Sequence, residues 1–190
     1  PISGTIIEGD TNDIDYTSNA ETLQLTWSGF NDDNSGLSHY QYGLGTTQGA
    51  DDIASFTETT ETSVVLEEEL IDGTTYFGVV RAYDVAGNIS EIVSGDGVMF
   101  DMSAPEAGTV VDGLEFTAST STLSATWSGF SDSGSGIQFY EYAAGTTSGG
   151  TDMTDWTVID LDTTVTDSSL VLAGGQIYYV SVRATDFAQN

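Results

Sequence analysis

The chain has no cysteine and no lysine, and each absence excludes a class of protein. Without cysteine there are neither disulfide bonds nor thiolate ligands for zinc, so stability has to come from buried apolar cores. The only basic side chains are Arg81 and Arg183, against 30 Asp and Glu residues and a formal net charge of -28. Nucleic acids and anionic membrane surfaces carry charge of the same sign and would be repelled. Cations are therefore the natural counterpart of this surface.

The sequence also lacks a signal segment, a run of 18 apolar residues and an initiating methionine. It begins at Pro1 and stops at Asn190, inside the second copy of a repeat. We therefore expect the chain to be an excerpt of a longer protein. Its 38% of hydrophobic residues suffices for two ordinary cores, which excludes a disordered acidic tail.

What the sequence does contain is one module written twice. Residues 127–130 repeat residues 27–30, and the shift of 100 also carries Tyr40 onto Tyr140. The shift is 104 at the start of the copies, because the first copy has four extra residues between Asp10 and Thr22. A repeat of about 100 residues has to bury its own core, so the pattern predicts tandem domains rather than a solenoid. We place repeat 1 at residues 1–104 and repeat 2 at residues 105–190.

The hydrophobic period within each copy is two residues, which is typical of half-buried antiparallel strands. Clusters of Gly, Asn, Asp and Ser separate these stretches, as turns require, and no stretch has convincing helical periodicity. The predicted fold class is all-β, with two tandem antiparallel β-sandwiches of about seven strands each, the second lacking its last strand. The strands expected in the first copy are Gly4–Glu8, Thr22–Trp27, Ser38–Leu44, Ala54–Thr59, Ser63–Leu66, Thr75–Tyr83 and Gly97–Asp101.

The same residues resemble the fibronectin type III superfamily. An Ala-Gly-Asn turn after the sixth strand and an Asp-x-x-x-Pro linker make the chain similar to bacterial Ig-like extracellular repeats of large adhesins and multidomain secreted enzymes. The resemblance implies a secreted or cell-surface location, a buried Trp between the sheets and a Tyr whose hydroxyl finds a backbone acceptor. The residues that carry it are Trp27/Trp127, Asp32/Asp132, Tyr40/Tyr140, Tyr76/Tyr178, Val80/Val182, Ala82/Ala184 and Asp84/Asp186.

The residue inventory argues against an enzyme. The only histidine, His39, is replaced by Phe139 in the other copy, which suits a strand position rather than a catalytic base. Paired carboxylates are too abundant here to indicate glycosidase chemistry, and no glycine-rich phosphate loop opens a helix.

Acidic residues at the ends of the modules are the first candidate site. Asp101, Asp132, Asp186 and Asn190 are expected to converge near the junction of the two repeats. Mixed carboxylate and amide oxygens are the ligands that calcium takes. The alternative is that these Asp and Asn side chains form hydrogen bonds to the backbone that shape their own loops, since no Asp-x-Asp-x-Asp-Gly loop is present.

The second candidate is aromatic. Phe56 and Trp156 occupy equivalent places in a predicted edge strand, where an exposed ring could stack on a sugar. The alternative is that each ring caps its own sandwich. Arg81 and Arg183, outward on the sixth strand, are expected to form surface ion pairs.

We expect the chain to be an extender: a pair of spacer repeats of a long secreted or cell-surface bacterial protein, whose partners are neighbouring repeats. One alternative is a carbohydrate-binding accessory module of a secreted hydrolase. Another is a filament subunit, in which a strand from another chain completes the second sandwich by strand addition. Flanking sequence would discriminate between the first two, because a spacer predicts further copies of the same period.

Overall fold

The computed structural model describes residues 1–113 and 117–190, which form two compact units, Pro1–Met102 and Ser103–Asn190. The described residues are arranged in strands, turns and loops, as predicted for an all-β protein. No helix among them is long and apolar enough to cross a membrane.

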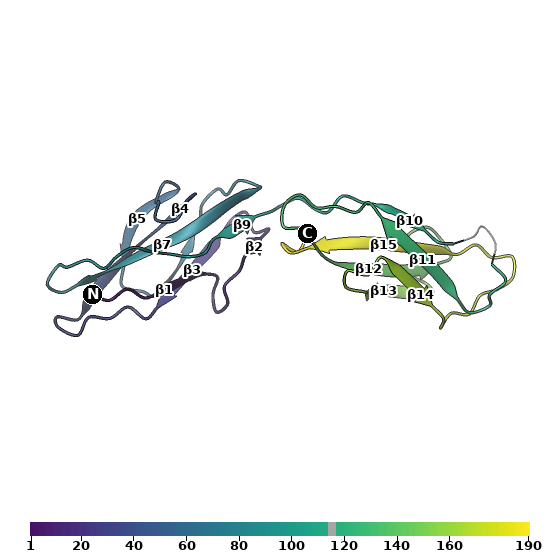
Figure 1. Ribbon diagram of the computed structural model, residues 1–190, viewed down its shortest axis with the longest axis horizontal. Coiled ribbons are helices and arrows are strands. Elements are labelled where there is room, and N and C mark those ends of the chain that lie inside the picture. The colour runs from purple at the N-terminus through teal and green to yellow at the C-terminus, as the bar shows by residue number, and fades with distance from the viewer. Residues whose placement is uncertain (114–116) are drawn as a thin grey trace. The chain divides into compact units, whose positions relative to one another are not determined.

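The first unit is a sandwich of two sheets (Figure 1). One sheet has the order β1-β3-β6 and is antiparallel throughout. The other has the order β2-β9-β7-β4-β5, with β8 also paired to β7. The bounds of the seven strands that were predicted are β1 (Thr5–Glu8), β3 (Leu23–Ser28), β4 (Leu37–Gly45), β5 (Ala54–Thr59), β6 (Ser63–Leu66), β7 (Thr74–Asp84) and β9 (Val98–Phe100).

Two short strands were not predicted. β2 (Tyr16–Thr17) lies in the segment that the second copy shortens, and it pairs in parallel with β9. β8 (Val93–Ser94) pairs with β7 just before β9 does, so two consecutive short strands occupy one edge of β7. Strands of two residues are too short to show a period, which is why the sequence pattern misses them.

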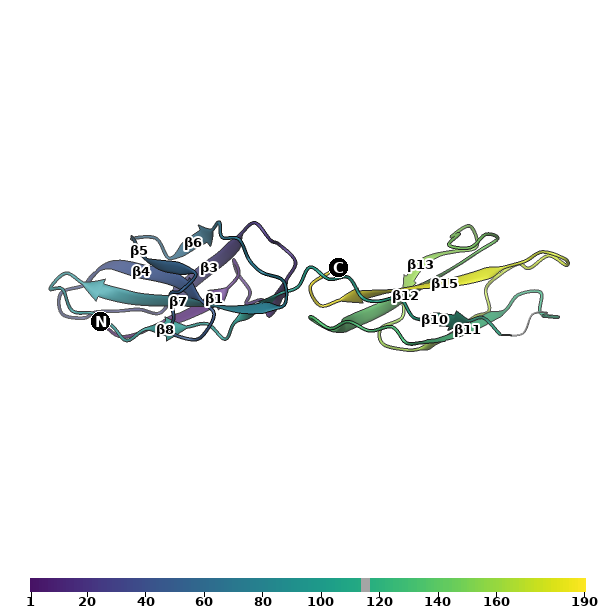
Figure 2. The same cartoon turned by 90° about the horizontal axis from the view of Figure 1, so that it is seen from above.

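The second unit repeats this plan with two three-stranded sheets, β10-β11-β14 and β13-β12-β15, which Figure 2 shows as separate layers. Their bounds are β10 (Thr109–Val111), β11 (Leu123–Ser128), β12 (Ile137–Gly145), β13 (Thr154–Val158), β14 (Thr164–Asp167) and β15 (Tyr179–Asp186). Within residues 103–113 and 117–190, no strand pairs with the other edge of β15. The prediction that the second sandwich lacks its last strand is therefore confirmed for the described chain.

The tryptophans fill the space between the sheets. The side chains of Trp27 and Trp127 are only 2% and 4% exposed. Each makes an edge-to-face contact with the equivalent tyrosine of the next strand, with ring centroids 5.7 Å apart for Tyr40 and 5.9 Å for Tyr140. Such large apolar side chains dominate the energetics of a core. The interpretation of both tryptophans as core residues is confirmed.

A second pair of equivalent tyrosines, Tyr76 and Tyr178, differs from the expectation in the direction of its hydrogen bond. Tyr76 and Tyr178 do bind the backbone of the preceding turn, but their hydroxyl oxygens accept rather than donate. The N–H of Ile71 donates to Tyr76 at 2.8 Å, and the N–H of Ala173 donates to Tyr178 at 2.6 Å. The expected direction of the hydrogen bond was wrong, because the turn presents a backbone N–H to the hydroxyl oxygen.

Candidate functional site

The acidic loops after β3 and β11 are each shaped by one aspartate. Asp32 Oδ1 accepts the N–H of Ser35 at 2.7 Å and that of Gly36 at 3.1 Å. The Ser35 hydrogen bond is the main reason that the pKa of Asp32 is lowered. In the second unit, Asp132 Oδ1 accepts the N–H of Gly136 at 2.7 Å. Both carboxylates thus act as backbone acceptors within their own loops.

The loops after β7 and β15 show the same arrangement. Asp84 accepts both the backbone N–H and the side-chain amide of Asn88, at 2.8 and 2.7 Å, and the side-chain bond lowers the pKa of Asp84. Asp186 accepts the same two groups from Asn190, at 2.8 and 3.1 Å. These contacts support the loop-shaping role for both Asp-Asn pairs.

The predicted calcium site draws on both units. Asp101 follows β9 of the first unit, where its N–H donates to the carbonyl of Thr17 at 2.9 Å, while Asp132, Asp186 and Asn190 belong to the second unit. Calcium bound by these four residues stays a prediction.

The aromatic candidates lie on edge strands, as predicted, and each is covered by an arginine. The guanidinium carbon of Arg81 lies 4.3 Å from the centre of the Phe56 ring, and that of Arg183 lies 4.4 Å from the Trp156 ring. Both rings are half-buried. A guanidinium at this distance is held by a cation–π interaction, so it occupies the ring face on which a sugar would stack.

The two arginines are anchored differently. Arg183 forms the expected ion pair, with Nε 2.6 Å from Glu141, and this hydrogen bond raises the pKa of Arg183. Arg81 instead donates from Nε and Nη2 to the amide oxygen of Gln41, at 2.9 and 2.7 Å. The expected ion pair of Arg81 was therefore wrong, because the neighbour across the strands is an amide where the second copy has a carboxylate.

His39 has a structural environment. Its ring stacks on Tyr83 with centroids 4.5 Å apart, and Nε2 lies 3.8 Å from the exposed carboxylate of Glu58. Its Nδ1 atom lies 3.2 Å from the hydroxyl of the adjacent Ser38. These contacts are those of a strand residue packed on a neighbouring ring and do not form a catalytic triad.

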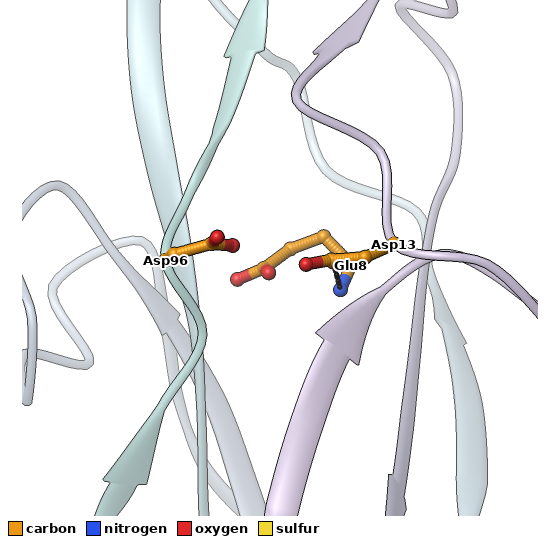
Figure 3. A group of neighbouring side chains, drawn as sticks. All are labelled: Glu8, Asp13 and Asp96. Atoms are coloured by element: carbon orange, nitrogen blue, oxygen red, sulfur yellow. Dashed lines mark hydrogen bonds between the residues drawn. The ribbon is translucent and has the colours of Figure 1, made fainter.

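A third group of polar residues was missed by sequence reasoning. Glu8, Asp13 and Asp96 each place a carboxylate oxygen within 4.8 Å of the others. Figure 3 shows the Glu8 side chain extending from the end of β1 toward Asp96, with Asp13 beside it. Glu8 is fully buried, whereas the other two residues are exposed to solvent. Burial raises the pKa of Glu8 to about 7, and burial together with the neighbouring Asp96 raises that of Asp13.

A signal for this cluster existed in the strand pattern. Ile6 and Glu8 share the inward face of β1, but Ile7 between them is also apolar, so the alternation did not reveal which face was buried. Asp13 lies in the segment between Asp10 and Thr22, which is four residues longer in the first copy, and Asp96 lies between β8 and β9. Their convergence on Glu8 depends on the tertiary structure.

Comparison with known proteins places these sandwiches in context. No known protein-family profile matches the chain. Exoglucanase B of Cellulomonas fimi is 31% identical over 185 residues, which cover 92% of this chain but only 15% of the length of that enzyme. The crystal structure of the chicken CNTN1 FN1-FN3 domains matches 98% of this chain and 64% of that one, with 14% identity and a TM-score of 0.48.

The chain thus forms antiparallel β-sandwiches, the fold that its resemblance to the fibronectin type III superfamily implies. In sequence it is similar to a region of a larger protein, Exoglucanase B. The chain spans only 15% of the length of Exoglucanase B, so the activity of that enzyme does not carry over to it.

Proposed function

We propose that the chain is a spacer: two non-catalytic sandwiches that separate functional parts of a longer secreted or cell-surface bacterial protein. Adhesins, extracellular filaments and multidomain secreted enzymes are the candidate architectures. A high negative charge without lysine suits such a role, because it keeps the exposed domains soluble in a medium rich in cations.

One observation carries this proposal: the features that the two copies share are those that hold the fold. Beyond the buried tryptophans, the copies repeat a turn in which Asp52 binds the backbone N–H and the hydroxyl of Thr46, at 2.9 and 2.8 Å. Asp152 and Thr146 repeat it at the same distances. The loop aspartates and the arginine-covered rings also recur. A binding module is expected to keep a ligand-facing side chain uncovered, and neither copy does so at Phe56 or Trp156.

The second candidate is a carbohydrate-binding accessory module, which the match to an exoglucanase favours. Trp156 is half-buried rather than fully buried. In this alternative a glucan displaces Arg183 from the ring.

Retention on insoluble glucans separates these candidates. The full chain is mixed with cellulose or another insoluble β-glucan, and the bound fraction is compared with that of Trp156→Ala and of Val158→Ala. Val158 lies on the same edge strand and is 54% exposed, which makes it a matched control. The spacer proposal expects no retention of any of the three proteins. Retention that is lost only in Trp156→Ala would replace it with the accessory module.

Strand addition stays a further possibility for the second unit. Among residues 103–113 and 117–190, no strand pairs with the edge of β15 opposite β12, so that edge could accept a strand from another chain. Concentration-dependent polymers in size-exclusion chromatography would support a filament subunit, and a concentration-independent elution volume supports the spacer.

A further inference from the structure

No basic side chain of the protein neutralises the carboxyl cluster of Glu8, Asp13 and Asp96, and the N-terminal ammonium of Pro1 lies beside Asp32. The sequence has two basic residues, and both are engaged elsewhere, Arg81 with Gln41 and Arg183 with Glu141. The only His, His39, faces Glu58. Three carboxylates within 4.8 Å of one another repel each other strongly when ionised, so the cluster requires either protons or a cation from outside.

The Glu8 carboxylate is held in place but left half satisfied. Oε1 accepts the N–H of Gly78 on β7 at 2.8 Å. Oε2 is buried and has no hydrogen-bond partner among residues 1–113 and 117–190. A buried carboxylate oxygen without a partner is costly, and most buried polar atoms in native proteins do have one. In Figure 3 the Glu8 carboxylate lies between the carboxyl groups of Asp13 and Asp96, so this buried side chain points into the cluster.

The backbone around Glu8 leaves room for its carboxylate. A Cβ atom on Gly95 would overlap both Glu8 oxygens, and one on Gly78 would lie 3.3 Å from Oε1. The N–H of Gly95 donates to the carbonyl of Gly78 at 2.9 Å. This hydrogen bond holds the segment between β8 and β9 against β7. The break between the two short strands is thus the place where a carboxylate enters the sheet edge.

We propose that Glu8, Asp13 and Asp96 bind a calcium ion at the end of β1, inside the first sandwich. The ion would contact the unpartnered Oε2 of Glu8 from within and would be reached by water through the exposed Asp13 and Asp96. This site is separate from the calcium predicted at Asp101, Asp132 and Asp186, and it does not depend on the spacer function.

The ligand chemistry selects a hard divalent cation, because all three side chains offer oxygen and the sequence has no cysteine. Two oxygens bound to one calcium at about 2.3–2.6 Å can be at most about 5 Å apart, which accommodates the 4.8 Å limit of this cluster. Magnesium binds at about 2.0–2.1 Å and demands near-octahedral geometry, so carboxylates from three separate segments fit calcium better.

The site would connect three segments that are distant in sequence. Asp13 also accepts the N–H of Glu8 at 2.9 Å, and Ile14 donates to the Glu8 carbonyl at 2.8 Å, so the inserted segment already folds back onto β1. Asp96 comes from the connection between β8 and β9. A shared ion would fasten the insertion and this connection to the same strand, and it would stabilise the folded state by binding to that state alone.

Calcium titration of the full chain, first stripped with EDTA, tests the proposal. Isothermal titration is run on the wild type and on Glu8→Gln, Asp13→Asn and Asp96→Asn. We expect one calcium equivalent, with an affinity in the range of about 10⁻⁴–10⁻³ M that extracellular modules show, to be weakened at least tenfold by each substitution. Asp10→Asn is the matched control, since Asp10 lies just before the inserted segment and accepts a hydrogen bond from the side-chain amide of Gln24. Its affinity is expected to equal that of the wild type.

Thermal unfolding provides a readout that a misfolded variant cannot imitate. In EDTA, Glu8→Gln is expected to unfold at a higher temperature than the wild type, because a buried charge is removed. In millimolar calcium, the wild type gains stability and Glu8→Gln does not. Asp186→Asn is tested in parallel, to distinguish this ion from the calcium predicted at Asp101, Asp132, Asp186 and Asn190. The proposal is overturned if the wild type gives neither heat nor a thermal shift with millimolar calcium, or if Glu8→Gln responds as the wild type does.

Discussion

Strand β7 of the first sandwich and the equivalent strand β15 of the second have related sequences but different surroundings. In the first unit β7 has β4 on one side and both β8 and β9 on the other, and Val79, Val80 and Ala82 are completely buried. In the second unit β15 pairs only with β12 among the described residues, and the equivalent Val182 and Ala184 are only half-buried.

This difference shows what the last strand contributes to such a sandwich. Ala82 donates its N–H to the hydroxyl of Ser90, and its carbonyl accepts from the N–H of Ser90, at 2.9 Å in both cases. The final segment therefore supplies hydrogen bonds and burial to a strand whose own sequence hardly changes between the copies. We expect the second sandwich to be the less stable of the two, and the following predictions test that comparison.

The largest effect is expected from the core tryptophans. Trp127→Ala should cost about 3–5 kcal/mol, as truncation of a buried aromatic residue does, and should unfold the second sandwich at room temperature. Trp27→Ala should cost a similar amount but leave the first sandwich folded, because it starts from a higher stability. Calorimetry with two separable transitions measures both. Equal residual stability of the two units would contradict the ranking.

The pH dependence should differ between the units when calcium is absent. The pKa of Glu8 is about 7 in the folded state, against 4.5 for an ordinary glutamate. The folded state then holds a proton that the unfolded state releases, so stability is greatest below about pH 4.5 and falls as the pH rises through 7.

The expected loss is roughly 3–4 kcal/mol for the first sandwich, because the two pKa values differ by about 2.5 and one pKa unit corresponds to about 1.4 kcal/mol. Urea unfolding in EDTA at several pH values measures it. Glu8→Gln should remove this loss, and the second sandwich, which has Asp112 at the equivalent position, provides the internal reference. A pH profile of the first transition unchanged by Glu8→Gln would refute the assignment to Glu8.

Adding a last strand should make the second sandwich resemble the first. We expect that appending the sequence of residues 89–101 after Asn190 buries Val182 and stabilises the second unit by about 1–3 kcal/mol. Hydrogen exchange of the β15 amides should slow at the same time. The same extension in scrambled order is the control. Equal protection from both extensions would mean that the edge does not recognise this strand.

The two buried tyrosine hydroxyls should differ in importance. Tyr76→Phe leaves the N–H of Ile71 without its acceptor, at a cost of about 1 kcal/mol. Tyr178→Phe should cost less, because Tyr178 is only half-buried whereas Tyr76 is fully buried, so water can replace the Tyr178 hydroxyl more easily. The difference between the two denaturation midpoints measures this, and a larger cost at Tyr178 would contradict the burial argument.

The smallest effect concerns the arginines. Glu141→Gln removes an exposed ion pair and should cost less than about 1 kcal/mol, with the cost shrinking as salt is added. Gln41→Ala removes neutral partners of Arg81, so its effect should not depend on salt. Urea denaturation at low and high salt distinguishes the two, and a salt-dependent effect of Gln41→Ala would point to an ionic partner of Arg81.

The repeat made much of the fold predictable. Two substitution-tolerant copies, aligned on Trp27 and Trp127, identify which residues every such sandwich needs, and the period of two identifies strands such as Ala54–Thr59 to the residue. The strands of two residues escaped, because a period needs more than one repeat of itself to be seen. The expected ion pair of Arg81 failed for a related reason: its partner is set by cross-strand register, which pairs Arg81 with Gln41.

By itself the amino-acid sequence determined the all-β class, the tandem organisation, the buried tryptophans and the excess of negative charge, because each follows from local pattern or composition. Only the tertiary structure decided which carboxylates meet. The aspartates of the polar loops bind their own backbone, while Glu8, Asp13 and Asp96 come together from three separate segments. Contacts within a loop are encoded by adjacent residues, whereas a cluster across strands depends on registers and on the packing of two sheets.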